Sequence, residues 1–375
     1  MLKHNTLTII SDTAIAKRNG ESVILEAPLR EIEYLSEEYE EIFWLGYSKN
    51  YNDSMRAPLA SNIRLISLPQ SGGRTFLKKI PIIFYMPLYL FRIFSYLKKS
   101  DVIHMRAPSV PAVLGMFCLY FLPAKKGWIK YAGTWIDKTA FTYNIQRKWL
   151  SSYNHLPATI LGEFNNQKPN HYSLYNPVYT RMTLENNLNS ARLKSFDNKL
   201  NIIFIGSLDS NKQPDLLLRI IINFKNDNRL GDVYFIGDGP LKSTLKNMVE
   251  NEKVNNIFIT GFKTREFINN IYELAHLIVL PSKSEGFPKV IAEATSFGVI
   301  PIVSDISCIN QIYKDKESAF LLNNNNIELS LSTTLRSILS GKIDLLQVSQ
   351  KVKDECFRFT YEIYKTSIRK IISKN

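Results

Sequence analysis

The sequence has little of what disulfide-rich, metal-binding or membrane-spanning proteins usually require. Its 375 residues include only three cysteines, Cys118, Cys308 and Cys356, which lie far apart and lack the spacing of metal ligands. This pattern indicates buried or free thiols in a reducing compartment and argues against a disulfide framework. The first residues offer only a short apolar run before Asp12, so we expect no signal peptide.

Long uninterrupted hydrophobic runs are also lacking. The stretch Ile80–Leu97 contains Arg92 and two prolines, and the stretch Ala107–Ala124 contains three prolines. A membrane-spanning helix needs about 20 predominantly apolar residues, so neither stretch predicts one. We interpret the second stretch as a buried helix between two strands. No segment repeats at a fixed period, which argues against solenoids and propellers.

Acidic residues are fewer than basic ones. The chain has 34 Asp and Glu but 47 Lys and Arg, which gives a net charge of +13. Such an excess indicates nucleic acid, an acidic membrane surface or a phosphorylated substrate as a partner, or simply serves solubility. The segment Lys78–Lys99 places basic residues around six aromatic ones. That pattern is typical of a helix in the membrane interface, but a core helix with a solvated end explains it equally well.

Apolar strand-like runs alternate with helical stretches along the whole chain, which predicts α/β architecture with parallel, doubly wound sheets. A polar stretch, Thr183–Asn198, separates two such halves. We predict a Rossmann-like domain over 1–180, a second one over 181–355, a cleft between them, and a final amphipathic helix within 356–375. The predicted strands are Leu7–Ser11, Ile42–Gly46, Ile63–Leu68, Val102–Met105, Trp128–Ala132, Ala158–Leu161, Asn201–Ile205, Val233–Ile236, Asn256–Thr260, Leu277–Leu280 and Ile300–Ser304.

Two short motifs follow strands of the second half, where ligands bind in such sheets. In Gly206-Ser-Leu-Asp-Ser-Asn-Lys212, the glycine admits a ligand close to the backbone and the lysine can reach a phosphate. In Gly237-Asp-Gly-Pro240, glycines mark a tight turn and the proline suits a helix start. Alone, either motif is equally explained by an ordinary turn between a strand and a helix.

The most informative motif is Pro281-Ser-Lys-Ser-Glu285-Gly-Phe-Pro-Lys-Val-Ile-Ala-Glu293. A helix that starts at Pro288 would offer N–H groups and a positive dipole end to a diphosphate. Glu285 and Glu293 would lie up to ~12 Å apart at helical rise, which is too far to share a proton. They could instead hold a sugar and a ribose at the two ends of one ligand.

These residues resemble the donor site of the retaining, family 4 glycosyltransferases of the GT-B fold. The spacing of Glu285 and Glu293 is similar to that family's E-x7-E motif, and the order of Gly206, Lys212, the 237–240 turn, Gly261 and Pro281-Ser282 is similar too. The resemblance covers about Leu200–Leu322. It implies a GT-B fold in which the last helix crosses back onto the N-terminal domain.

The resemblance implies a role for each matching residue. Glu285 would hold the hydroxyls of the donor sugar, Glu293 those of the ribose, and Lys212 would neutralise the diphosphate, while Phe262 and Lys263 would lie near the base. We therefore predict Glu285, Lys212 and Arg106 as catalytic. The predicted substrate-binding residues are His104, Gly206, Ser207, Phe262, Lys263, Ser284, Gly286, Phe287, Pro288, Lys289 and Glu293.

Three departures from the family pattern affect these roles. Ser207 stands where the family usually has an arginine, so one phosphate contact is missing or comes from elsewhere. Arg106 stands where members often have a histidine, with His104 two residues earlier in the strand; Arg106 could replace the lost charge or pair with an acidic sugar or acceptor. The first loop has Lys17-Arg-Asn-Gly20 instead of a double glycine, so acceptor binding does not transfer.

The mechanism that we predict uses protein cations instead of a metal. Cleavage of a sugar–phosphate bond leaves negative charge on the diphosphate, which Lys212 and helix N–H groups would stabilise in the place of Mg²⁺. The sequence has no Asp-x-Asp and no His/Asp cluster at metal-ligand spacing. We thus expect no metal and no cofactor. No carboxylate is placed for double displacement, so the hypothesis is front-face substitution with retention.

We predict a hexosyltransferase that moves a hexose-type sugar from a nucleotide sugar, with UDP as the first choice, to a glycan or lipid-linked acceptor in polysaccharide or lipopolysaccharide synthesis. The expected place is the cytoplasm, with peripheral contact to anionic lipid on the inner membrane. No nucleic-acid-binding motif is present, so we expect no nucleic acid partner. The alternatives are a nucleotide-sugar epimerase or phosphorylase on the same fold, and a catalytically inactive scaffold at a membrane.

Overall fold

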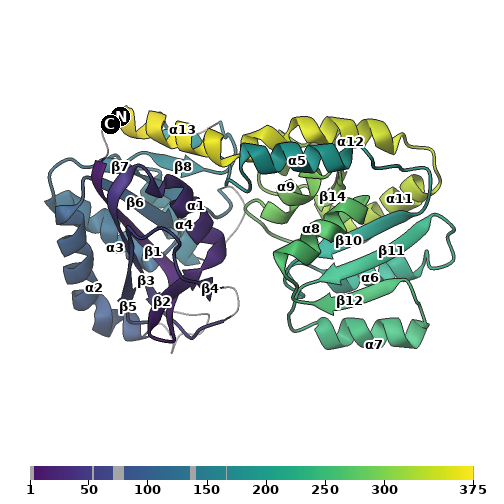
Figure 1. Ribbon diagram of the computed structural model, residues 1–375, viewed down its shortest axis with the longest axis horizontal. Helices are drawn as coiled ribbons and strands as arrows, with labels where there is room; N and C mark the ends of the chain where they lie inside the picture. Colours follow the sequence, from purple (N-terminus) through teal and green to yellow (C-terminus); the bar gives the residue numbers. More distant parts are fainter. Residues whose placement is uncertain (1–3, 53–54, 71–79, 136–140, 166, 375) are drawn as a thin grey trace. The chain divides into compact units, whose positions relative to one another are not determined.

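The computed structural model describes residues 4–52, 55–70, 80–135, 141–165 and 167–374 (Figure 1). The chain forms two compact units: unit 1 comprises Met1–Tyr175 and Tyr364–Asn375, and unit 2 comprises Asn176–Ile363.

Unit 1 is built on a sheet of nine described strands, of which β5, β3, β1, β6, β7, β8 and β9 lie side by side and parallel. The outer half of β1 pairs with β2 in antiparallel orientation, and β2 pairs with β4. The strands are β1 His4–Arg18, β2 Glu21–Leu25, β3 Tyr39–Ser48, β4 Met55–Arg56, β5 Ile63–Leu68, β6 Val102–Ala107, β7 Lys126–Tyr131, β8 Ala158–Ile160 and β9 His171–Ser173.

Helices cover both faces of this sheet, so each strand buries alternate side chains in two different cores. On β1, Ile10 enters the core shared with α2, α3 and α4, whereas Ile9 enters the core shared with α1 and α13. The helices are α1 Glu26–Ser36, α2 Ile80–Lys99, α3 Val110–Cys118, the 3-10 turn η2 Leu119–Phe121, α4 Phe141–Leu150 and α13 Tyr361–Ser373.

The start of unit 1 differs from the sequence-based expectation. We expected Lys17–Gly20 to be the loop after the first strand, but β1 continues to Arg18 and turns back at Asn19-Gly20 into β2. Both turn residues have positive φ, 49° and 86°, as two-residue hairpin turns require. The Asn-Gly dipeptide is itself a strong hairpin signal, and the prediction overlooked it. The sheet is therefore mixed, not purely parallel.

Unit 2 contains a purely parallel sheet with the strand order β12-β11-β10-β13-β14-β15. Its central strands are apolar throughout because both faces are covered, and every residue of β13 and β14 is buried. The strands are β10 Leu200–Ile205, β11 Leu230–Ile236, β12 Ile257–Gly261, β13 Leu277–Leu280, β14 Ile300–Ser304 and β15 Phe320–Leu322.

The order of strands reverses at β10, because the chain first adds β11 and β12 on one side and then returns to place β13 on the other. In open α/β sheets the crevice at such a switch point is where ligands bind. The helices of unit 2 are α5 Arg181–Ala191, α6 Pro214–Ile222, α7 Lys242–Glu252, α8 Arg265–Leu274, α9 Lys289–Ser296, α10 Ile309–Ile312, α11 Ile327–Leu339 and α12 Leu345–Asp354, with 3-10 turns η3 Asn324–Asn326 and η4 Cys356–Phe359.

Two segments expected from the sequence take different forms. Most of the polar stretch Thr183–Asn198 is helix α5, whose amino end is capped by the Thr180 side chain accepting the Thr183 N–H at 3.1 Å. The stretch Ala107–Ala124 forms α3 and η2, but it is buried on one side only, since Phe117 and Phe121 are exposed.

The crossing segment near the carboxyl terminus belongs to both units. Residues 356–363, which we grouped with the last helix, lie in unit 2. They are held there because Phe359 stacks on Phe287 and its carbonyl accepts the Val178 N–H at 2.8 Å. From Tyr364 onward α13 packs into unit 1, where Ile368 and neighbouring residues join the core beneath α1.

The described helices include none with the length and apolar character needed to cross a membrane. Of the Lys78–Lys99 segment, residues 80–99 form α2, while Lys78 and Lys79 lie outside the described residues.

Candidate functional site

The predicted donor residues gather at the switch point of unit 2. The loop that carries Gly206 and Lys212 follows β10, and the loop that carries Glu285 follows β13. Because β10 and β13 are neighbouring parallel strands, their carboxyl ends lie at the same edge of the sheet. The sequence spacing therefore placed both motifs correctly after their strands, although nothing in it specified that they would touch.

Lys212 and Glu285 form a direct ion pair between these two loops. Each side chain is 17% exposed, so the pair is shielded from bulk water yet still open on one side. A partly buried pair of this kind strengthens electrostatics, because the local dielectric is lower than that of water. An anionic ligand at this position would compete with Glu285 for the lysine.

Asp209 organises the first loop, and sequence reasoning missed it. Its carboxylate accepts the backbone N–H groups of Asn211 and Lys212 at 3.0 Å each, and the Ser207 hydroxyl at 2.8 Å. Burial would raise the pKa of Asp209, but these hydrogen bonds outweigh it and hold the pKa below its ordinary value. An aspartate that bonds N–H groups two and three residues ahead is an Asx turn, which was a readable signal.

Asn211 fastens the two loops together. Its side-chain amide donates to the Ser284 carbonyl at 3.0 Å, and its own carbonyl accepts the Lys283 N–H at 2.8 Å. Gln213, which follows Lys212, has the left-handed conformation with φ 53° and precedes Pro214 at the start of α6. The position of Lys212 is thus fixed from both sides by backbone geometry.

The loop after β11 packs against the same region through glycine. A Cβ atom on Gly237 would lie 1.8 Å from the carbonyl oxygen of Gly206, so only glycine fits there. Backbone hydrogen bonds join the two loops, with the Gly206 N–H donating to Ile236 at 3.0 Å and the Leu208 N–H donating to Asp238 at 2.9 Å. The predicted glycine turn is therefore a packing device that supports the Lys212 loop.

The loop that enters α9 presents backbone more than side chains. The Phe287 ring is buried and stacks on Phe359 with ring centroids 4.9 Å apart, and Pro288 is buried as the residue that precedes the helix. Gly286 is half-buried, and so are the predicted contacts Ser284 and Lys289. Phe287 and Pro288 could therefore line a ligand only through their main chain, and proline has no N–H to donate.

Glu293 lies inside α9, where both carboxylate oxygens already have partners. One accepts from Arg265 Nη1 at 3.2 Å and the other from the Tyr272 hydroxyl at 3.1 Å. Burial, followed by the Glu293 charge, raises the pKa of Tyr272 well above its ordinary value, so this hydroxyl stays a donor. Sequence reasoning missed Arg265 and Tyr272, since each comes from α8, more than 20 residues before Glu293.

The predicted base-binding residues follow β12. Phe262 is a large apolar side chain, yet it is 67% exposed. Its ring is therefore available to stack on a planar ligand. The neighbouring Lys263 places its ammonium 4.9 Å from the centre of the Phe267 ring.

Arg106, which lies in unit 1 near the end of β6, belongs to a buried charge cluster. Its Nη1 lies 3.2 Å from Glu31, whose carboxylate also contacts the Lys130 ammonium at 2.6 Å and the Tyr364 hydroxyl at 2.7 Å. Glu31 is 1% exposed, and Arg106 keeps 17% of its side chain exposed. The arginine is therefore anchored, with one edge still accessible.

His104 does not occupy a position from which it could bind substrate. Its side chain is wholly buried on β6 and stacks on Trp128 with ring centroids 4.1 Å apart. Burial lowers the pKa of His104 well below its ordinary value, and nearby Arg106 adds to the effect. The prediction of a substrate contact for His104 is therefore dropped in favour of a core role.

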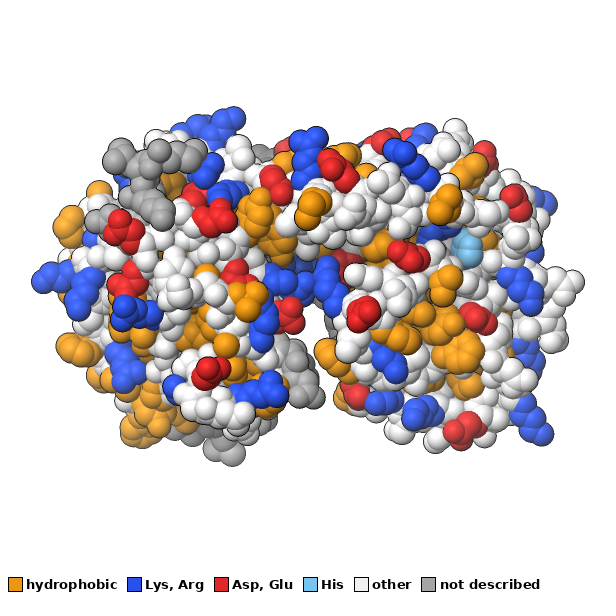
Figure 2. Space-filling view, in the orientation of Figure 1, with side chains coloured by type: hydrophobic (Ala, Val, Ile, Leu, Met, Phe, Trp, Pro, Cys, Tyr) orange, Lys and Arg blue, Asp and Glu red, His pale blue; other side chains and the backbone are white. Residues whose placement is uncertain are grey.

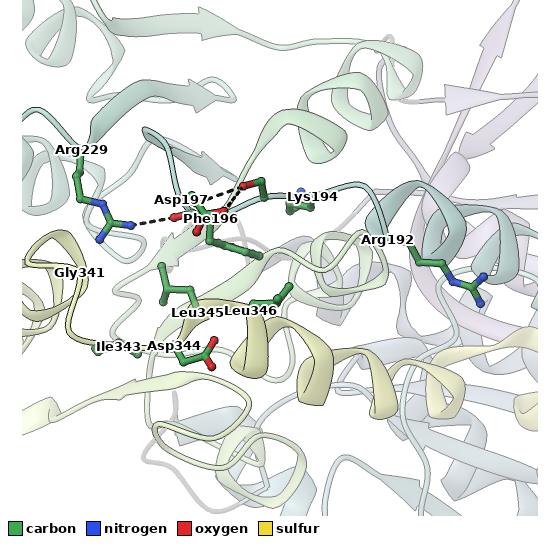
Figure 3. Close-up of a pocket in the computed structure, with 11 residues that line it drawn as sticks. Arg192, Lys194, Phe196, Asp197, Arg229, Gly341, Ile343, Asp344, Leu345 and Leu346 are labelled. Carbon is green, nitrogen blue, oxygen red and sulfur yellow. Dashed lines mark hydrogen bonds between the residues drawn. The ribbon is translucent and has the colours of Figure 1, made fainter.

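A cavity of about 690 Å³ elsewhere in unit 2 does not hold the predicted residues (Figure 3). It lies beside the start of β10, at the amino ends of the strands, and is lined by Phe196, Leu345 and basic residues. Two of its cations hold the backbone: Arg229 donates to the Phe196 carbonyl at 2.9 Å, and Lys194 donates to the Tyr272 carbonyl at 2.9 Å. We interpret this cavity as a structural junction.

Among the described residues no cluster of His, Cys, Asp and Glu could hold a metal ion.

Comparison with known proteins shows which family the second half of the chain resembles. Residues 186–354 match the model of "Glycosyl transferases group 1". An uncharacterised glycosyltransferase of Haemophilus influenzae is 31% identical over 163 residues, or 43% of this chain and 45% of the relative. An alpha-1,4-N-acetyl-D-galactosaminyltransferase of Campylobacter jejuni, whose name gives a glycan on PP-undecaprenol as its acceptor, is 27% identical over 184 residues, or 48% of this chain and 50% of the relative.

The chain thus spans about half the length of these curated relatives. Among solved structures, Anabaena HepE in complex with UDP and glucose resembles the chain with a TM-score of 0.69 at 11% identity, covering 99% of this chain and 100% of the other. At such identity the likeness establishes the fold. Residues 186–354 are therefore similar to the glycosyl transferases group 1 family, and the chain as a whole has the GT-B fold.

Proposed function

We propose that this protein is a retaining glycosyltransferase that takes a hexose-type sugar from a nucleotide sugar, most readily a UDP-sugar, and transfers it to a glycan or lipid-linked acceptor. The observation that carries the proposal is the partly open Lys212–Glu285 ion pair at the switch point of unit 2. It places a cation suited to a diphosphate beside a carboxylate suited to sugar hydroxyls, inside a match to the group 1 family.

Each residue has a role that follows from its surroundings. When the donor binds, Lys212 exchanges part of its contact with Glu285 for the diphosphate, and Glu285 turns its oxygens to the sugar. Glu293, oriented by Tyr272 and Arg265, accepts from the ribose hydroxyls. The exposed ring of Phe262 and the aliphatic stem of Lys263 lie against the base.

The chemical step needs stabilisation of the leaving diphosphate, which carries growing negative charge as the bond to the anomeric carbon breaks. Lys212 and the amino end of α9 supply it, and no metal ion is required. The leaving phosphate takes up the proton of the acceptor hydroxyl, so the new bond forms on the same face of the sugar and the anomeric configuration is retained.

The relatives support the choice of acceptor and donor. The Campylobacter jejuni enzyme acts on a glycan carried by PP-undecaprenol, and Anabaena HepE was solved with UDP. A lipid-linked or cell-surface glycan as acceptor and uridine as base are therefore the proposals to test first.

The experiment measures nucleotide release from a panel of UDP-, GDP- and dTDP-sugars in excess EDTA, with wild type beside Glu285→Ala. We expect slow release from one donor that survives EDTA and disappears in the variant. Glu252→Ala is the matched control, because it removes a carboxylate from an exposed lysine pair of the same unit. Conversion of the donor sugar without nucleotide release would instead indicate an epimerase.

The ion pair allows a second test, whose binding part needs no acceptor. Glu285→Gln removes the carboxylate that competes for Lys212, so UDP should bind more tightly while transfer slows. Lys212→Met should weaken UDP binding by about tenfold or more, since a charge-assisted contact contributes about 1.5–3 kcal/mol. Calorimetry measures both. Unchanged UDP affinity in both variants, or an unchanged transfer rate in Glu285→Gln, would exclude the proposed site.

A further inference from the structure

One side of unit 1 exposes large apolar side chains that its own core does not need. Along α2, Tyr89 and Ile93 point into the core, whereas Phe84 and Phe91 are 78% and 71% exposed. The two phenylalanines lie seven residues apart, about two helical turns, and so share one side of the helix. The helix is therefore apolar on the side that faces solvent as well as on the side that faces the core.

The neighbouring helix continues the same surface. α3 packs beside α2 over a common core, and Phe117, Tyr120 and Phe121 at the end of α3 and in η2 are exposed. The rings of Phe117 and Phe121 lie 5.3 Å apart. We call the six most exposed large apolar and aromatic residues of these elements the apolar face: Ile83, Phe84, Phe91, Phe117, Tyr120 and Phe121.

The positive charge of the chain is concentrated in the same part of the sequence. Residues 64–148, which include α2, α3 and η2, contain 14 Lys and Arg but only two Asp and no Glu, a net charge of +12 out of +13 for the chain. The rest of the protein is thus nearly neutral. This asymmetry is too large for a charge that serves only general solubility.

Basic side chains border the apolar face at one end. Lys98 and Lys99 close α2 and are exposed, and Lys125 is held beside them because its ammonium donates to the carbonyls of Lys98 at 3.2 Å and Ser100 at 2.8 Å. Figure 2 shows hydrophobic and basic side chains together along the left edge of the view, where Figure 1 places α2.

We propose that the apolar face and its lysines dock this protein onto a bilayer that contains anionic lipid. The aromatic rings enter the boundary between headgroups and acyl chains, and the lysines contact the phosphate layer. This inference does not depend on the proposed transferase activity.

Two other occupants fit the surface less well. A second copy of the chain would bring together two surfaces that are each bordered by Lys98, Lys99 and Lys125, and like charges at an interface oppose association. A single-stranded nucleic acid needs planar rings for base stacking along a basic groove, whereas Ile83 and the neighbouring exposed Met86 have no ring. Acyl chains and anionic headgroups accept all of these side chains.

The test is vesicle flotation of the full chain with phosphatidylcholine alone and with phosphatidylcholine plus phosphatidylglycerol. We expect flotation only with the anionic vesicles and its loss at high salt. Lys98→Gln combined with Lys99→Gln should lower partitioning roughly thirtyfold, at about 1 kcal/mol for each lysine near the surface. Phe84→Ser combined with Phe91→Ser should lower it roughly tenfold or more.

Matched variants in unit 2 separate the surface from its bulk properties. Lys199→Gln with Lys342→Gln removes the same charge from exposed positions, and Leu193→Ser removes an exposed apolar side chain; both should float like wild type. Tryptophan emission checks that the α2 variants remain folded.

Three outcomes would overturn the proposal. The first is equal flotation on neutral and anionic vesicles, and the second is equal loss in the α2 and unit 2 variants. The third is sedimentation showing a dimer, or RNA binding, that the Phe84→Ser and Phe91→Ser changes abolish while flotation persists.

Discussion

The buried cluster around Glu31 gives a quantitative prediction. Glu31 faces two cations, Arg106 at 3.2 Å and Lys130 at 2.6 Å, and also accepts from Tyr364. Lys130 is only 5% exposed, so Glu31→Gln would remove the carboxylate that its buried ammonium contacts at 2.6 Å. Removal of one partner from a buried pair costs about 3–5 kcal/mol. The variant should therefore lose about a fifth or more of the ~5–15 kcal/mol that stabilises a typical domain.

The assay follows from where the tryptophans lie. All four, Trp44, Trp128, Trp135 and Trp149, are in unit 1, so their emission during urea denaturation reports the unfolding of that unit alone. The expected change is a lower midpoint with an unchanged slope.

Two further variants show whether the stability lost in Glu31→Gln comes from the buried charge of Lys130 or from poorer packing. Lys130→Met in the Glu31→Gln background removes the buried cation that has lost its contact with Glu31 and should recover most of the loss. Arg369 on α13 forms a more exposed contact with Glu38. Arg369→Met breaks this contact and should cost no more than about 1 kcal/mol. A loss in Glu31→Gln no greater than this control, or no recovery in the double variant, would refute the reasoning.

Three other predictions concern unit 2. Burial, followed by the charge of a nearby lysine, lowers the pKa of His276 from 6.5 to about 4. Between pH 6.5 and 4 the unfolded chain binds a proton at His276 that the folded chain does not bind, so the free energy of unfolding falls as the pH falls through this range. After allowing for solvent screening, we expect a loss of about 2 kcal/mol. The profile of melting temperature against pH should be flatter in His276→Gln, and an equally steep profile would contradict this account. Gly237→Ala places a Cβ against Gly206 and should cost about 1–3 kcal/mol by thermal melts while slowing transfer; a wild-type melt and rate would contradict the packing argument. Tyr272→Phe frees Glu293 and should weaken UDP binding about fivefold by calorimetry with kcat nearly unchanged; equal affinity would show that the hydroxyl does not orient the carboxylate.

Periodicity and turn chemistry were enough to predict eleven of the fifteen described strands, while β2 and the short strands β4, β9 and β15 were missed. Strands such as Leu277–Leu280 are apolar at every position because helices cover both faces, and this signal is local. The same holds for Lys212 and Glu285, whose distance from the ends of their strands can be counted along the chain. The hairpin at Asn19-Gly20 was also readable, and its omission was an error of interpretation.

Contacts between distant segments could not be predicted in this way. The Tyr364 hydroxyl meets Glu31 across 333 residues, and Asn211 meets Ser284 across 73. Such pairs depend on how finished elements pack, and a single sequence carries no period or spacing that records them. The burial of His104 belongs to the same class, because β6 has helices on both faces and every residue of Val102–Met105 is inside.

Since Asn211, Asp209 and the paired glycines tie the loops around Lys212 to one another within unit 2, this part of the chain can be inherited as a module. Changes in unit 1 leave those hydrogen bonds intact, so the two halves are free to diverge at different speeds. The family match over residues 186–354 lies wholly inside unit 2. For recombination in the laboratory, the natural junctions are therefore near Asn176 and Tyr364, where one half can be exchanged between homologues while the other keeps its internal bonding.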